Sequence, residues 1–164
     1  ENQRALIGVG DRLDDLVPKA LGQSDPSVVD MLARRCLAEG RVDLAAQLIP
    51  KATSAMKREL QTAVAAREGD LAALAKLDPD RKDLVPTMTL PVRGDKIISF
   101  HVSTPSGIVP SAKDLKIQLA KEPVAARAIE RRASLFTIML EDDKAAALTV
   151  QYCDQTLFDD QVQP

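Results

Sequence analysis

The sequence is poor in the side chains that perform most enzyme chemistry. Its 164 residues include one histidine (His101), one tyrosine, two cysteines and no tryptophan, and residues 1–99 contain no aromatic residue. General acid–base and nucleophilic catalysis draw mainly on His, Cys and paired carboxylates gathered in one pocket. Because this inventory is almost empty, we predict that the chain is not an enzyme.

Metal sites and membrane spans also lack support. Cys36 and Cys153 cannot form a CxxC-type motif, and one histidine cannot complete a site, so we expect no metal and no cofactor. Two reduced structural cysteines predict a cytoplasmic location. No apolar run approaches the roughly 18–20 residues of a membrane span. No secretory segment opens the chain. Its first residue is Glu1 and not Met, so we expect a trimmed or excised piece.

What the sequence does contain is an ordinary globular composition. Hydrophobic residues make up 45% and charged residues 28% of the chain, which argues against wholesale disorder. The length suits one domain, or a small domain with a helical appendage.

Amphipathic helical patterns dominate residues 1–78. The clearest begins where Asp25 can cap free backbone N–H groups and Pro26 takes the first helical position. Gly40 is expected to end this helix, and a similar step recurs at Gly69, as in helical hairpins. We predict helices at 6–17, 26–39, 43–49, 54–67 and 70–77, the first ended by Pro18.

Period-two alternation follows a boundary near Asp78-Pro79-Asp80. Alternating apolar residues predict strands at 87–92, 98–103, 115–120, 135–141 and 147–153. Between the third and fourth strands, Glu122-Pro123 is expected to open a helix to about Ala133, with Val124, Ala125, Ala128 and Ile129 on its inner face.

The sequence therefore predicts an α+β fold, in which N-terminal helical hairpins precede a mostly antiparallel five-stranded sheet (βββαββ) with one covering helix. The expected regions are a helical region at 1–78, a sheet domain at 84–154 and an acidic C-terminal tail at 155–164. The βββαββ order behind a helix resembles class I chaperones of type III secretion, small acidic dimers with an αβββαββα plan. The resemblance concerns topology, which by itself does not fix function.

Three motifs have simple structural interpretations. Gly8-Val9-Gly10 lacks the third glycine of a dinucleotide-binding loop, so we predict no nucleotide site. Arg93-Gly94-Asp95 spells the integrin-recognition tripeptide, but we interpret it as a hairpin turn in which the glycine supplies positive φ. His101 falls on the polar side of its strand beside Ser99 and Ser103, which favours a surface histidine over a catalytic triad.

The charges are unevenly distributed although the net charge is only −2. Residues 81–132 hold ten Lys or Arg against five Asp or Glu, whereas residues 141–164 hold six acids against Lys144 alone. This asymmetry is typical of an ordinary mixed surface. It also fits an acidic tail or edge that meets the basic stretch within the fold or across subunits.

The best candidate partner-binding residues lie in the basic stretch. Arg127 and Arg131 stand four apart on the predicted helix, with Arg132 next to them and Lys113 and Lys116 upstream. Guanidinium groups on one helical face could grip phosphates or an acidic protein. No aromatic side chains are interleaved for base stacking, so a solvated helix face is the default interpretation.

These observations favour a non-enzymatic protein–protein interaction or assembly protein. It would act through helical and charged surfaces in a larger complex, by self-association or with a protein partner, without membrane or nucleotide. One alternative is a nucleic-acid-binding accessory protein that uses the basic helix. Another is a secretion-chaperone-like or phage- or virus-type assembly subunit. A third is an enzyme that uses His101 with a nearby Ser or Asp.

Overall fold

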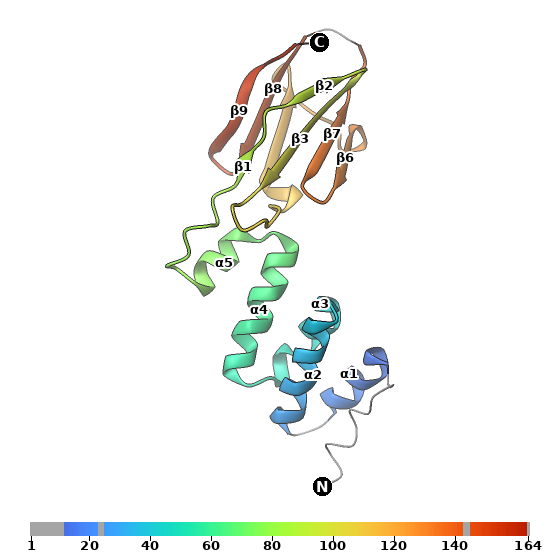
Figure 1. Cartoon of the computed structure of the whole chain (residues 1–164), viewed down its shortest axis with the longest axis vertical. Coiled ribbons are helices and arrows are strands. Elements are labelled where there is room, and N and C mark those ends of the chain that lie inside the picture. The colour runs from blue at the N-terminus through green and yellow to red at the C-terminus, as the bar shows by residue number, and fades with distance from the viewer. Residues whose placement is uncertain (1–11, 23–24, 143–144, 164) are drawn as a thin grey trace. The chain divides into compact units, whose positions relative to one another are not determined.

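The computed structural model describes residues 12–22, 25–142 and 145–163 (Figure 1). It confirms the predicted α+β class, with helices followed by antiparallel sheets. The described residues form two compact units. Unit 1 extends through Glu68 and includes Ala72–Pro79, and unit 2 consists of Gly69–Leu71 and the chain from Asp80 onward.

Unit 1 is a bundle of short helices around an aliphatic core. Buried residues between positions 13 and 60 pack against one another, and this core includes Leu16, Leu32, Cys36, Met56 and Leu60. The helices are α1 (Leu13–Leu21), α2 (Pro26–Ala38), α3 (Val42–Gln47), the 3-10 helix η2 (Ile49–Lys51), α4 (Ser54–Glu68) and α5 (Leu71–Leu77).

The predicted cap of α2 is confirmed, whereas the predicted end of the first helix is not. Asp25 Oδ1 accepts a hydrogen bond from Ser27 N at 2.9 Å, which satisfies a free N–H of the first turn. Helix α1 continues through Pro18 to Leu21, because buried Leu16 and Val17 hold its apolar face against the core. Residues 6–11 of the predicted 6–17 helix lie outside the described residues.

The repeated glycine step has a common geometry. Gly40 follows α2 and Gly69 follows α4, and both adopt φ of +70°. Glycine enters this left-handed region without the steric cost that a Cβ brings, so each residue can end one helix and let the next begin.

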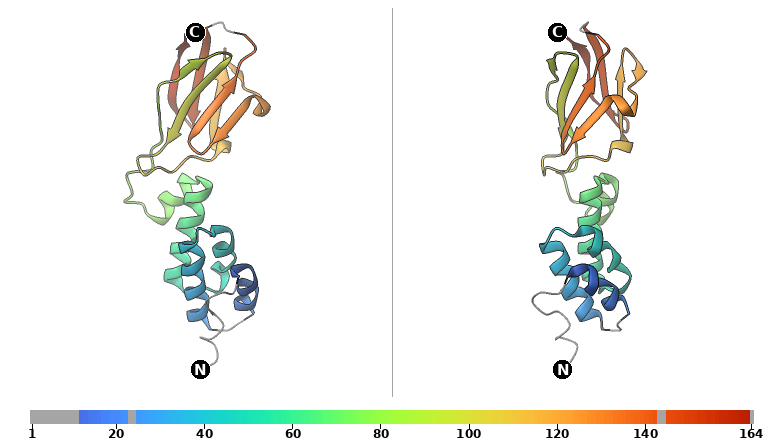
Figure 2. Two further views of the ribbon diagram at one scale, coloured as in Figure 1. Left: turned by 45° about the vertical axis from the view of Figure 1, so that its right-hand side comes forward. Right: turned by 90° about the vertical axis from the view of Figure 1, so that its right-hand side faces the viewer.

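Unit 2 is a sandwich of two antiparallel sheets, seen as two layers in Figure 2. In sheet 1 the order is β1-β3-β7-β6, and β2 also pairs with β3. Its strands are β1 (Thr87–Met88), β2 (Val92–Gly94), β3 (Ile97–Ser103), β6 (Ile129–Arg132) and β7 (Leu135–Met139). In sheet 2 the order is β5-β4-β8-β9. Its strands are β4 (Leu115–Leu119), β5 (Glu122–Pro123), β8 (Ala146–Tyr152) and β9 (Gln155–Val162).

The inward-facing residues of both sheets form the core of unit 2. Alternate residues of β3, β7 and β8 are buried, and the Phe100 and Phe136 rings stack with centroids 5.7 Å apart. The chain crosses between the sheets, so that β1, β2, β3, β6 and β7 share one layer and β4, β5, β8 and β9 share the second. This is the strand order of immunoglobulin-type sandwiches, a topology that serves many unrelated functions.

The helix predicted from Glu122 to about Ala133 does not form. That segment contains β5, a single 3-10 turn η4 (Ala126–Ala128) and β6. Ile129 pairs with Ile138 and Arg131 pairs with Phe136, so both residues lie on the inner face of sheet 1. The sequence did not predict a strand here because Arg131, a charged residue, occupies an inward-facing position of β6 and conceals the apolar alternation. The αβββαββα plan requires a helix at this point of the chain, so the topological likeness to secretion chaperones is not supported.

The expected acidic tail at 155–164 is largely an edge strand. Gln155–Val162 form β9, which pairs with β8 along its length and places Val162 in the core. The sequence did not predict this strand because Asp160, a charged residue, interrupts the apolar alternation. Asp160 pairs with Leu148 at a core-facing position, and it remains exposed to water because β9 is an edge strand.

No helix in the described residues is long and apolar enough to cross a membrane.

Candidate functional site

The segment that crosses from sheet 2 to sheet 1 lines two cavities of unit 2. It leaves β4 by a two-residue turn in which Ala120 and Lys121 have φ of 51° and 70°. Pro123 lies in the edge strand β5. Proline has no backbone N–H, and at this edge position the sheet does not need one for a hydrogen bond. Val124 N donates to Ile117 O at 3.0 Å, after which the chain passes to β6. We call residues 119–129 the crossover segment.

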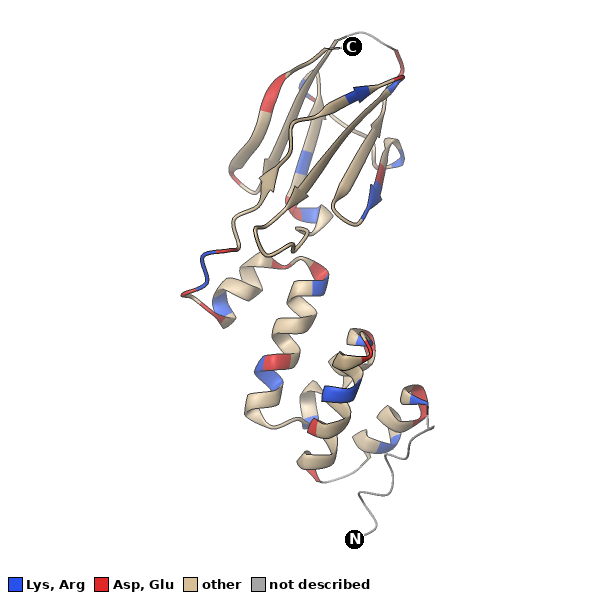
Figure 3. Cartoon of the chain, viewed as in Figure 1, with Lys and Arg blue, Asp and Glu red and all other residues tan. Residues whose placement is uncertain are grey.

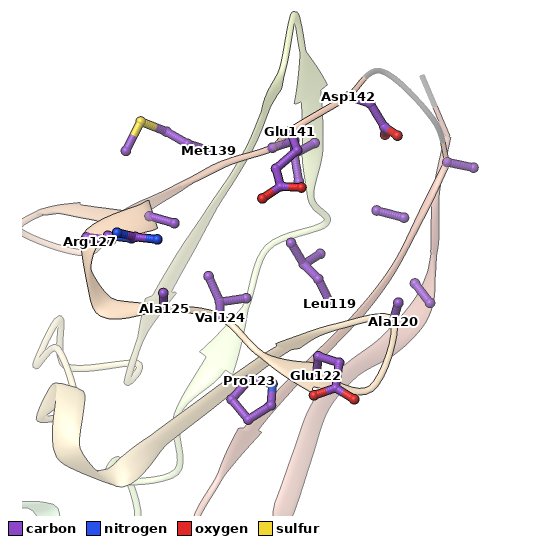
Figure 4. Close-up of a pocket in the computed structure, with 15 residues that line it drawn as sticks. Leu119, Ala120, Glu122, Pro123, Val124, Ala125, Arg127, Met139, Glu141 and Asp142 are labelled. Carbon is purple, nitrogen blue, oxygen red and sulfur yellow. The ribbon is translucent and has the colours of Figure 1, made fainter.

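Two adjoining cavities flank the crossover segment and share Pro123 and Val124. The larger has a volume of about 610 Å³ and lies between this segment and the end of β7. Figure 4 shows Leu119 and Val124 inside it, with Glu122 on one side and Glu141 and Asp142 on the other. The smaller cavity, of about 340 Å³, reaches the core at Ile117, Ile129 and Phe136.

The larger cavity combines a small apolar floor with a charged rim. Arg127 contributes the positive charge, and Glu122, Glu141 and Asp142 the negative ones. Arg93 Nη2 donates to Asp142 O at 3.3 Å, which ties β2 to the loop after β7. Among the described residues, no three His, Cys, Asp or Glu side chains lie close enough to hold a metal ion. The arrangement suits contact with another surface better than ion binding.

Arg131 packs over the ring of Phe136, a residue that lines the smaller cavity. Its guanidinium carbon lies 5.3 Å from the centroid of the Phe136 ring, and its Nε donates to Ala133 O at 3.2 Å. The aliphatic stem of an arginine can lie along apolar surface while the charged head stays in water. Arg131 therefore completes the inner face of sheet 1 at its edge and still presents a positive charge to solvent.

The structure disperses the five predicted partner-binding residues. Arg127 lies on η4 and lines the larger cavity, and Lys116 on β4 lines the smaller one. Arg132 is an exposed residue of β6 whose Nη2 lies 2.7 Å from Glu130 Oε1. Lys113 lies on the 3-10 helix η3 (Ala112–Asp114) and lines neither of these two cavities. The common helical face on which the nucleic-acid interpretation depends is absent.

Sequence reasoning missed an exposed apolar cluster on the outer face of sheet 1. Val92, Ile97 and Met139 are 68%, 37% and 52% exposed. Ile97 pairs directly with Met139, and Val92 sits diagonally across from Ile97 because it pairs with Ser99. The alternation along β3 shows that Ile97 faces away from Ile98 and the core. That alternation is readable in the sequence, but the strand pairings that gather the three side chains are not.

His101 and the Arg-Gly-Asp motif occupy structural positions. His101 is an exposed residue of β3 whose Nδ1 lies 3.0 Å from Ser134 Oγ. Arg93 pairs with Ile98 and is half-buried, so the tripeptide is not displayed as a tip. Gly94 does not have positive φ; Lys96, with φ of 52°, takes that role in the turn. Gly8-Val9-Gly10 lies outside the described residues.

No known family model matches the sequence, no curated protein is significantly similar to it, and the search of solved structures found no match.

Proposed function

We propose that this chain is a non-enzymatic interaction and assembly protein that binds other protein surfaces within a larger complex. The observation that carries the proposal is the apolar cluster of Val92, Ile97 and Met139 on the outer face of sheet 1. Contiguous apolar side chains on a water-facing sheet mark interaction sites, and methionine is enriched in protein interfaces.

Two further features support this function. Immunoglobulin-type sandwiches offer flat sheet faces and edges for recognition, although the topology alone identifies no partner. Cys36 and Cys153 are both free thiols, which is compatible with a reducing compartment and with a cytoplasmic assembly.

The proposal is tested by changing the cluster on the full chain. Ile97→Lys with Met139→Lys puts two charges on the contact face, so the complex formed in the native source should shrink or disappear. Thr87→Lys with His101→Lys is the matched control, because both residues are exposed on the same outer face away from the cluster.

Light scattering on protein purified from the native source measures the result. We expect the unchanged chain and the control to form species larger than the 17.7 kDa monomer, and the cluster variant to lose them. The proposal would be refuted if the unchanged chain remained monomeric at every concentration, both in its native source and after purification.

A further inference from the structure

Unit 2 carries charges of opposite sign on its two flanks. We define the acidic flank as Asp154, Asp159 and Asp160, on β9 and the turn before it, and the basic flank as Lys121, Arg127 and Arg131. Strand β1 lies beside β9 on one side of the sandwich, whereas Pro123 of β5 and Ile129 of β6 line one cavity on the other. The red of β9 and the blue of β6 accordingly appear on opposite sides in Figure 3.

The acidic flank is not neutralised by its surroundings. Residues 145–163 contain no Lys or Arg. Asp159 accepts a hydrogen bond from Thr149 Oγ1 at 2.8 Å, and Asp160 accepts one from Gln161 N at 2.7 Å. Within the described residues, neither carboxylate has a cationic partner. Their charges therefore remain available to another molecule.

The basic flank is likewise open. Arg127 is exposed and has no ion-pair partner in the described part of the chain, and Arg131 is exposed over Phe136. Lys121 is exposed in the turn after β4. Residues 116–132 hold five Lys or Arg against Glu122 and Glu130, and Glu130 is already paired with Arg132. Glu141 and Asp142 line the larger cavity together with Arg127, and they reduce the positive balance of the flank without removing it.

We propose that the sandwich unit associates head to tail with a second copy of this chain, the acidic flank of one copy against the basic flank of the next. The inference rests on the proposed function and names the partner. Because opposite flanks of one sandwich cannot neutralise each other, their attraction is satisfied only between molecules. Pairing like flanks would instead bring equal charges together.

Side chains, and not an extended backbone ladder, make this contact. Asp160 occupies a core-facing register position at the edge, and such inward charges prevent continuous pairing with another strand. A contact between two different surfaces repeats from copy to copy, giving a ring or an open chain. Because surface charges are screened by salt, the association should weaken steeply as ionic strength rises.

Reciprocal charge reversal tests the proposal on the full chain. Variant A carries Arg127→Glu and Arg131→Glu, so both of its flanks are acidic; variant B carries Asp159→Lys and Asp160→Lys, so both are basic. The control, Lys82→Glu with Lys113→Glu, makes the same charge change as variant A at exposed positions outside both flanks. Sedimentation equilibrium at low and high salt measures association, and circular dichroism verifies folding.

We expect the unchanged chain and the control to associate at low salt and to return to monomers at high salt. Variants A and B alone should each lose roughly tenfold or more in association constant, since like charges now face each other. Their equimolar mixture should recover it, because acidic flanks meet basic ones. If Arg131→Glu unfolds the protein, Lys121→Glu with Arg127→Glu replaces variant A and leaves the Phe136 contact intact.

A folded mixture of A and B that stays monomeric would overturn the inference, as would a control as defective as variant A. Binding of the basic flank only to nucleic acid or to an unrelated acidic protein would also overturn it. In those cases a larger complex in the native source would leave the proposed function standing. Monomers in every experiment would remove both.

Discussion

Arg131 lies with its guanidinium carbon 5.3 Å from the centroid of the Phe136 ring, which in turn stacks on Phe100. This contact gives a charged residue a place at the edge of an apolar core. It explains how β6 joins sheet 1 although its sequence, Ile-Glu-Arg-Arg, has only one apolar residue. The same guanidinium also contributes to the basic flank.

Replacing Arg131 by alanine should destabilise unit 2. An exposed cation–π contact is worth about 0.5–1 kcal/mol, and the stem's contact with the core adds to the loss. Arg132→Ala is the matched control, because its exposed ion pair with Glu130 contributes about 0–1 kcal/mol. Urea unfolding measures both changes. Equal losses in the two variants would show that the ring contact contributes nothing of its own.

The two left-handed glycines should respond differently to alanine. A Cβ at Gly40 meets nothing within 4 Å, so Gly40→Ala should cost only the left-handed strain of about 1–2 kcal/mol. At Gly69, within unit 2, a Cβ would lie 2.1 Å from Val109 O and 2.6 Å from Ser111 N. Overpacking adds about 1–3 kcal/mol to the same strain.

Thermal and urea unfolding of the two glycine variants measure this difference. A Gly69→Ala protein as stable as Gly40→Ala would mean that the backbone at Val109–Ser111 yields easily.

The two thiols should differ sharply in reactivity. Cys36 is fully buried in α2, and burial together with the nearby Glu39 raises its pKa above the ordinary value. Cys153 is exposed in the turn between β8 and β9. Because the thiolate is the reactive form, a disulfide reagent should modify one thiol quickly and the second only after unfolding.

Single serine variants assign the two phases of that reaction. Cys153→Ser should remove the fast phase, and Cys36→Ser should leave it unchanged. Rapid modification of Cys36 in the native protein would contradict its burial.

Asp83 should titrate below ordinary aspartates. Its hydrogen bonds from Arg81, with Nε 2.7 Å from Oδ1, are the main cause that lowers its pKa to about 2, and a hydrogen bond from Ser106 adds to this. The folded-state pKa is below the usual 3.8, so the carboxylate stabilises the fold fully above pH 3.8 and loses this effect as the pH falls through about 2.

Carboxyl chemical shifts followed by NMR against pH measure that pKa. Arg81→Ala should raise it toward 3.8, whereas Arg132→Ala should not move it. An unchanged titration in Arg81→Ala would exclude the ion pair as the cause.

Local signals were sufficient for most of the helical unit, although not for the end of α1 at Leu21. Helix α2 was predictable because its cap at Asp25, its proline at the first position and its apolar spacing all lie within a few residues of one another. The glycine steps at Gly40 and Gly69 were readable for the same reason, since glycine is the residue that adopts positive φ at the lowest steric cost. The strands at β3, β4, β7 and β8 also follow from their alternation.

The hairpin turns of the sandwich gave no such signal. Among the described residues, the non-glycine positions with positive φ are Lys96, Ala120, Lys121, Ala133 and Cys153, and all of them lie in turns between paired strands. Glycine or asparagine usually marks these turns. Pairing of the flanking strands has to compensate the local strain, so the turn at Ala133 could not be seen without its partner strands.

The amino-acid order alone determined the helices with their caps, the alternating strands, the scarcity of reactive side chains and the uneven charge. Tertiary structure decided that β6 and β9 are edge strands, because the Phe136 ring accepts Arg131 and the open edge keeps Asp160 in water. It also decided that the two charge groups lie on opposite flanks, since strand order depends on long-range pairing. No short window of sequence records that pairing.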